Sequence, residues 1–221
     1  MLGGRKSAKD NGISIENREL IYARMCEFPE GSLFTQADIV QGQDWAEDFA
    51  CLRDYDYVHV ADGYFTRIVE TDYLRRLPKV SDVISSYETL HGTHLIKTGD
   101  RTAWEIGLKQ WEPVEGYRFY SSDRSDLLSL GRMKIRIIPA PSWLRSLQKD
   151  ATLFRCFYDQ PYKDIDHSLA QSFRNSSIGK SGVETAAHYG ASILMEDVPE
   201  GWPSPHEVAA KMIDFVKKDE S

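Results

Sequence analysis

The sequence contains few cysteines and none in a recognisable pattern. Cys26, Cys51 and Cys156 are the only three among 221 residues. They do not follow the spacings of zinc or redox motifs, and an odd number cannot complete a disulfide framework. We therefore expect neither a structural metal nor a disulfide scaffold. Three unpaired thiols are typical of a protein in the reducing cytoplasm.

Long apolar runs are absent as well. The sequence has no stretch of about 18 apolar residues, which a membrane-spanning helix requires, and no apolar signal-peptide core. We therefore expect neither membrane insertion nor secretion. Hydrophobic residues make up 41% and charged residues 28% of the chain, as is typical of globular proteins. The length suits two small domains, each with its own core.

Positive charge is scarce. The chain has 27 Lys and Arg against 34 Asp and Glu, a formal net charge of −7, which argues against nonspecific coating of nucleic acid or of an anionic membrane. The excess of acidic over basic side chains is unevenly distributed along the chain. Residues 1–80 and residues 151–221 each have a net charge of −4, whereas residues 81–150 carry 10 basic and 9 acidic side chains. A local basic face is therefore compatible with this central third.

Motifs for catalysis or cofactor binding are also lacking. Residues 179–181, Gly-Lys-Ser, match the end of a phosphate-binding loop, but Arg174 stands where that motif begins with glycine. His91 and His94 have no third metal ligand nearby, and no serine stands in a nucleophile-elbow setting. We therefore predict a protein that is not an enzyme and that needs no metal and no cofactor.

Residues 91–141 have the clearest pattern in the chain. Thr102 and Glu105 stand at capping-box spacing, which predicts that a short helix begins there. Further on, Met133, Ile135 and Ile137 share one face of a strand whose other face carries charge. The predicted strands are 93–97, 117–120 and the two arms of a hairpin, 127–130 and 133–138. Beyond residue 147 the pattern is weaker: it predicts helices near 164–173, 183–189 and 208–215, and leaves open the structure of residues 153–157.

The first third of the chain has the element order of a winged helix-turn-helix. The pattern of residues 15–28 predicts a first helix. Thr35 is a favourable N-cap for a second helix at 36–41, and a third helix is predicted after Gly42. Asp62 and Gly63 then predict the turn of a hairpin. The winged helix spans residues 15–79, after a flexible N-terminal arm at 1–14. That arm contains Lys and Arg, so contact with a phosphate backbone is its alternative role.

The third helix would be the DNA-reading element. Glutamine pairs with adenine edges, so Gln41 and Gln43 at its start are candidate readers, together with Trp45. The helix is otherwise acidic, with Arg53 as its nearby cation, and carboxylates repel phosphates. DNA binding and a solvated or protein-binding acidic face therefore remain alternatives.

Further candidate DNA contacts lie on the wing and before the second domain. These are Arg67, Arg75 and Arg76, for which a solvated linker is the alternative. The domain boundary is predicted at residues 78–81, with the second domain spanning 80–221. In that domain a second basic face is predicted from the charged side of the last strand, and a solvated strand face is its alternative. Its candidate residues are Lys97, Arg101, Arg124, Arg132, Lys134 and Arg136.

Two stretches resemble a known family, the AbiEi-type antitoxins. Residues 98–141 resemble the second domain of these proteins, and GSLFTQADIV at 31–40, with Gly63 and Tyr64, is similar to their winged helix. The match covers about two thirds of the chain. In the second domain the matching positions are Thr98, Gly99, Ala103, Gly107, Leu108, Gln110, Pro113, Tyr120, Ser125, Gly131 and Ile135.

The resemblance implies a function as well as a fold. It implies an α+β protein, a winged helix-turn-helix followed by a mixed α/β domain, in a bacterial or phage cytoplasm. Such antitoxins bind and repress their own promoter, a double-stranded operator, and neutralise a co-encoded nucleotidyltransferase toxin of the AbiEii type. Together they form a type IV toxin-antitoxin system, used in abortive infection as phage defence, in which direct contact with the toxin is not required.

This chain departs from the family where DNA binding needs charge. Cys51 stands where relatives have an arginine late in the recognition helix, and Asp54 to Asp56 replace a basic segment. The competing hypothesis is therefore a protein-interaction module that does not bind DNA and whose acidic winged helix docks a basic partner.

Overall fold

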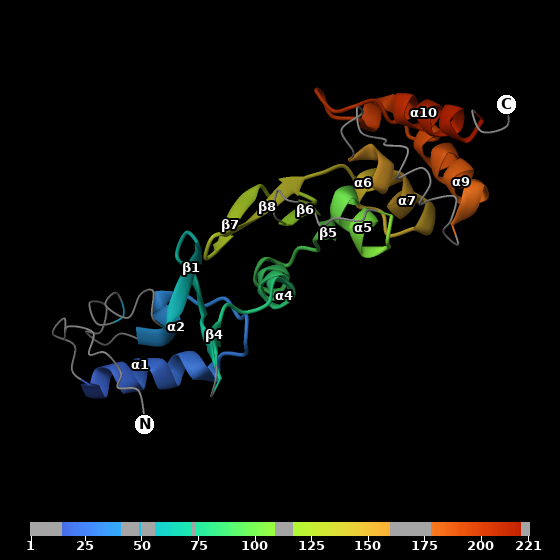
Figure 1. Ribbon diagram of the computed structural model, residues 1–221. Coiled ribbons are helices and arrows are strands. Elements are labelled where there is room, and N and C mark those ends of the chain that lie inside the picture. The colour runs from blue at the N-terminus through green and yellow to red at the C-terminus, as the bar shows by residue number, and fades with distance from the viewer. Residues whose placement is uncertain are drawn as a thin grey trace. The chain divides into compact units, whose positions relative to one another are not determined.

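The computed structural model shows an α+β protein (Figure 1). It describes residues 15–40, 49, 56–71, 74–108, 117–159 and 178–217. The chain divides into two compact units. The first comprises residues 1–92 and 128–133, the second residues 93–127 and 134–221. The predicted boundary at 78–81 precedes α4 (Val80–His91), which this division counts with the first unit.

The first unit begins with two helices that share an apolar core. Helices α1 (Ile15–Glu27) and α2 (Gln36–Val40) contact each other. Thr35 precedes α2 as predicted: its hydroxyl accepts a hydrogen bond from the Asp38 N–H, and the Asp38 carboxylate accepts one from the Thr35 N–H at 2.7 Å. This reciprocal pair fixes the start of α2. The buried core residues are Ile21, Met25, Phe34, Ile39, Val40, Phe49 and Tyr57.

The predicted wing is present as an antiparallel hairpin of β1 (Tyr57–Ala61) and β2 (Tyr64–Arg67). Gly63 in its turn has a φ of 75°, which glycine adopts without strain. A β-bridge between Phe34 and Phe65 ties the segment before α2 to the hairpin. Helix, bridging segment, helix and hairpin follow in the order expected for a winged helix. The predicted third helix lies outside the described residues, apart from the helical Phe49.

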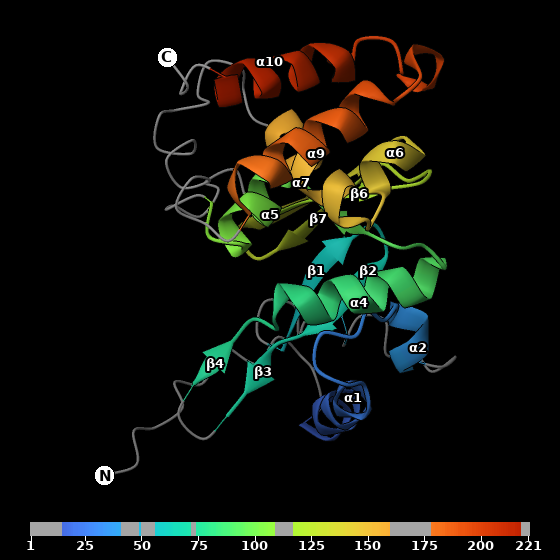
Figure 2. The ribbon, with the colours of Figure 1, turned by 90° about the vertical axis from the view of Figure 1, so that its right-hand side faces the viewer.

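A two-stranded ribbon and helix α4 complete the first unit (Figure 2). The ribbon pairs β3 (Val69–Glu70) with β4 (Arg75–Arg76). Helix α4 is attached to the α1–α2 connection, because the Ser86 hydroxyl accepts a 2.8 Å hydrogen bond from the Leu33 N–H. Gly31 lies so close to α4 that a Cβ at this position would be 2.5 Å from the Asp82 Cβ. These contacts place α4 in the first unit.

The second unit is built on a four-stranded sheet whose order is β5-β6-β8-β7. Its strands are β5 (Ile96–Lys97), β6 (Tyr117–Ser121), β7 (Asp126–Leu130) and β8 (Met133–Pro139). β6 pairs with β5 antiparallel and with β8 parallel. The predicted β7–β8 hairpin is confirmed, and its tip, residues 128–133, is counted with the first unit.

Helices supply the rest of the second unit. They are α5 (Gly99–Glu105), α6 (Ser142–Arg145), α7 (Lys149–Tyr158), α9 (Gly179–Ala191), the 3-10 turn η1 (Met195–Asp197) and α10 (Pro205–Lys217). α9 contacts both α7 and α10 (Figure 2). The helices predicted at 183–189 and 208–215 are confirmed, and residues 153–157 lie within α7. The helix predicted at 164–173 lies outside the described residues.

The predicted start of α5 is wrong. The helix begins at Gly99 rather than at Thr102, because Thr98 precedes it with extended backbone angles. Thr102 lies one turn inside the helix, where its hydroxyl donates to the Thr98 carbonyl at 2.9 Å. Within the described residues, no helix has the length and apolar character needed to cross a bilayer.

Candidate nucleic-acid interface

Three cations lie together on one face of the second unit's sheet. Arg118 on β6 and Arg136 on β8 are in register on neighbouring parallel strands, which lie about 5 Å apart. Lys134 precedes Arg136 by two residues and therefore projects from the same face. The alternate residues of β8, Ile135 and Ile137, project to the opposite face. They are 0% and 1% exposed. We call Arg118, Lys134 and Arg136 the basic row.

The sequence pattern predicted two members of the basic row and missed the third. Lys134 and Arg136 were identified from the alternation of charged and apolar residues, and both are exposed. Arg118 lies between the half-buried Tyr117 and the buried Phe119, in a strand whose burial does not alternate. Its place beside Arg136, however, depends on the parallel pairing of β6 with β8, two strands separated in sequence by β7. Alternation alone does not reveal that pairing.

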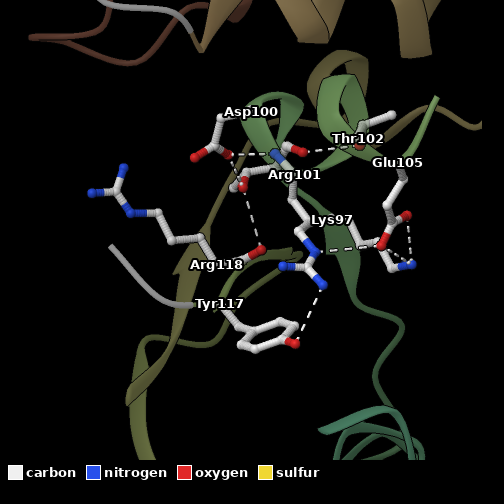
Figure 3. Close-up of polar contacts among 8 residues, drawn as sticks. Lys97, Asp100, Arg101, Thr102, Glu105, Tyr117 and Arg118 are labelled. Atoms are coloured by element: carbon white, nitrogen blue, oxygen red, sulfur yellow. Dashed lines mark hydrogen bonds and ion pairs between the residues drawn. The ribbon is translucent and has the colours of Figure 1, made fainter. Parts of the chain in front are cut away.

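Lys97 and Arg101 do not add open positive charge to this face. The Lys97 ammonium donates to both oxygens of Glu105, at 2.9 and 2.8 Å. Arg101 is 8% exposed, and its guanidinium lies over the rings of Trp104 and Tyr117, with its central carbon 4.6 and 4.3 Å from their centroids. Figure 3 shows Arg101 beside the Tyr117 ring. The prediction that both residues belong to a basic surface is corrected accordingly.

Arg101 instead joins α5 to β6. Its Nε lies 3.4 Å from Glu105 one turn later in the helix, and an Nη donates to the Tyr117 hydroxyl at 3.3 Å. Figure 3 shows the Arg118 side chain extended away from this cluster. A guanidinium between two rings packs as a flat, partly apolar group. The cluster therefore orients the strand on which Arg118 lies.

The two remaining predicted cations of the second domain lie in turns. Arg124 is half-buried in the turn after β6, where its N–H donates to the Ser121 hydroxyl at 3.3 Å. Arg132 is exposed in the β7–β8 turn, beside Gly131, whose φ is 62°. Neither lies on a strand of the basic row.

The predicted DNA contact on the wing lies at its base. Arg67 ends β2 and pairs with Tyr57, the first residue of β1. It is half-buried, and its Nε is buried without a hydrogen-bond partner. The tip of the wing carries Asp62 and Gly63, both exposed. Positive charge is therefore placed near the body of the unit and not at the tip.

The ribbon arginines are engaged within the protein. Arg76 pairs with Glu30, with 2.7 Å between an Nη and Oε1, and Arg75 lies 3.6 Å from Asp56. The other predicted DNA-binding residues lie outside the described residues. These are Gln41, Gln43, Trp45 and Arg53.

A buried carboxylate anchors α5 and β6 from the helical side. Asp159, just after α7, accepts hydrogen bonds from the Gly99 N–H and from the Tyr120 hydroxyl. Burial raises the pKa of Asp159 to about 6, although these two hydrogen bonds act in the opposite direction. Asp100 raises this pKa further and Arg155 lowers it. Sequence reasoning gave no signal for this residue.

Replacing this carboxylate is expected to change the pH dependence of stability. A folded-state pKa near 6, above the usual 3.8 of an aspartate, means that Asp159 stabilises the fold fully only below about pH 4. That contribution is lost as pH rises through about 6. Asp159→Asn cannot titrate, so its free energy of unfolding relative to wild type should rise by about 1–3 kcal/mol between pH 4 and 7.5.

Urea denaturation of Asp159→Asn and wild type at four pH values across this window measures the difference. Asp214→Asn is the matched control, because Asp214 is an exposed carboxylate on α10 of the same unit. A constant difference between Asp159→Asn and wild type at all pH values would contradict the prediction.

Comparison with known proteins shows the fold and not the family. No family model and no curated protein matches this sequence. Among solved structures, the crystal structure of the RV2827C protein from Mycobacterium tuberculosis is similar, with a TM-score of 0.50 at 15% sequence identity. The match covers 91% of this chain and 77% of that chain. At this identity the likeness concerns the architecture alone.

Proposed function

We propose that the protein is the antitoxin and transcriptional autorepressor of a type IV toxin-antitoxin system. Its operator is double-stranded DNA of its own promoter, and its functional partner is a nucleotidyltransferase toxin of the AbiEii type. The observation that carries DNA binding is the basic row on β6 and β8. The winged-helix order of the first unit and the resemblance of both units to AbiEi-type antitoxins support the repressor role.

The two units divide the work of recognition in this proposal. Phosphate contacts fix position and supply affinity, and contacts with base edges supply specificity. The basic row presents three cations on one strand surface and is suited to phosphates. Base reading belongs to the winged helix, where Gln41 and Gln43 are the candidate readers. Repression of the shared promoter then limits the toxin, which is consistent with neutralisation that needs no direct contact.

A titration of the gene's upstream DNA in a gel-shift assay, at several salt concentrations, tests this function. Three phosphate contacts from the basic row predict that log K falls with log salt with a slope of about −3 or steeper. An unrelated duplex of equal length is the control, and it should bind at least about 1000-fold more weakly. The absence of a specific complex at low salt would overturn the proposal.

One observation favours the alternative of a protein-interaction module. Arg75 and Arg76, two of the basic residues of the first unit, are already paired with carboxylates. An acidic first unit would then bind a basic protein and not DNA. The same titration separates the two functions, because a module of this kind leaves both duplexes unbound at every salt concentration.

A further inference from the structure

The arginines of β4 are held by carboxylates from distant parts of the first unit. Arg76 makes a two-pronged contact with Glu30: one Nη lies 2.7 Å from Oε1, and the other donates to Oε2 at 3.1 Å. Arg75 lies 3.6 Å from Asp56. The side chains of Arg76 and Arg75 are 36% and 45% exposed. Both guanidinium groups therefore remain accessible from solvent while they are paired.

A carboxylate paired in this way occupies the groups that a phosphate would use. The planar guanidinium fork binds the two oxygens of a carboxylate and of a phosphate with the same geometry. Glu30 lies within ion-pair distance of Arg76 and accepts a hydrogen bond from one Nη, while the other Nη also donates to the Leu77 carbonyl at 3.3 Å. In the ribbon, Glu70 is also in register with Arg75 on the opposite strand. A DNA phosphate that approaches β4 must therefore displace a carboxylate and meets further negative charge.

We propose that Glu30 and Asp56 act as internal substitutes for phosphate and limit the affinity of the first unit for DNA of unrelated sequence. This role rests on the proposed DNA-binding function and adds residues that determine its specificity. A genome offers very many nonspecific sites, so occupancy of an operator depends on the ratio of specific to nonspecific affinity. Masking Arg75 and Arg76 lowers the nonspecific, charge-driven affinity and so raises that ratio.

The backbone segments that carry the two carboxylates make hydrogen bonds that do not involve the arginines. Glu30 lies in the α1–α2 connection, where the Ser32 N–H donates to the Pro29 carbonyl at 3.1 Å. Asp56 stands directly before β1, and its carbonyl accepts a 2.9 Å hydrogen bond from the Ile68 N–H. These backbone hydrogen bonds position the chain segments on which Glu30 and Asp56 lie. Partly exposed ion pairs contribute little to folding, so loss of the Glu30–Arg76 pair is expected to leave the fold intact.

Glu30→Gln is the direct test, with an unrelated 20-base-pair duplex as the probe. Freeing Arg76 adds about one phosphate contact, so we expect the affinity to rise about 3- to 10-fold near 0.1 M salt and the salt slope to steepen by about 1. Glu19→Gln is the matched control. It removes the same charge from an exposed position on α1, and it should change the affinity less than about twofold.

A double-mutant cycle separates a freed arginine from a general change in net charge. Arg76→Gln should weaken binding of the unrelated duplex by a larger factor in the Glu30→Gln background than in wild type. Asp56→Asn should act in the same direction through Arg75, and thermal unfolding of each variant verifies that it is folded. Equal effects of Arg76→Gln in both backgrounds, or equal affinities of Glu30→Gln and Glu19→Gln, would overturn the role of Glu30.

The upstream DNA of the gene serves as a second probe. If wild type gives no specific complex with it, the proposed repressor function fails. The comparison on the unrelated duplex still decides the role of Glu30, because that comparison needs no operator. If the upstream DNA does bind specifically, Glu30→Gln should lower the ratio of specific to nonspecific affinity. An unchanged ratio would contradict the assignment of specificity to Glu30.

Discussion

Gly99→Ala should lower the free energy of unfolding by about 3 kcal/mol, because it forces α5 away from α7. A Cβ at this position would lie 1.9 Å from the carbonyl oxygen of Arg155 and 2.4 Å from its carbonyl carbon. These are backbone atoms inside a helix, so they cannot rotate away as a side chain does. The N–H of Gly99 also donates to Asp159, and a shift of α5 would weaken that bond.

Chemical denaturation of Gly99→Ala beside Gly182→Ala measures the effect. Gly182 is the matched control: a Cβ there would lie 2.6 Å from the Ile178 Cγ2, the end of a side chain that can move. We expect a loss below about 1 kcal/mol for Gly182→Ala. Part of that loss is offset because alanine favours helix more than glycine does. Equal losses for the two variants would show that the contact between α5 and Arg155 does not limit packing.

The elements that the sequence predicted well are those whose signals are local. The capping pair at the start of α2 is Thr35 and Asp38, three residues apart. The side chain of each accepts a hydrogen bond from the backbone N–H of the other. The wing turn needs only Asp62 and Gly63, with apolar residues on either side. Periodicity and turn chemistry contain this information, and so the α+β class and the hairpins followed from it.

The features that the sequence did not predict depend on partners far away along the chain. Glycine is needed at position 99 because the backbone lies against Arg155, 56 residues later, and a motif within α5 cannot show this. Arg101 was read as surface charge, yet Trp104 and Tyr117 enclose its guanidinium. The sequence around a charged residue on a short helix is the same whether its side chain faces solvent or packs between two aromatic rings. Only the three-dimensional packing distinguishes the two cases.

The same reasoning separates the two sets of candidate DNA contacts. Arg76 and Lys134 are both basic residues on short strands. Arg76 meets Glu30, which is 46 residues away in sequence, whereas Lys134 and Arg136 share their strand face with Arg118. Sequence reasoning named both residues as candidate contacts, each with a solvated surface as its alternative. Lys134 and Arg136 are both exposed at the second unit's strand surface, and there we expect the largest functional effect.

Reversing the charge of Lys134 and Arg136 together should weaken binding of the upstream DNA at least about 100-fold at 0.1 M salt. Two phosphate contacts are lost, and two carboxylates then repel the backbone. Both side chains are exposed, so the fold should be unaffected within about 0.5 kcal/mol. Loss of repression of a promoter reporter should accompany the loss of binding.

The matched control is a second double variant in the same unit, Lys149→Glu with Lys211→Glu. Lys149 on α7 and Lys211 on α10 are exposed and lie off the sheet. This variant changes the net charge by the same amount and should weaken binding no more than about threefold, as a long-range effect that salt screens. If both double variants weakened binding equally, the total charge would matter and the basic row would not. If Lys134→Glu with Arg136→Glu bound like wild type, the second unit's strand surface would not contact DNA.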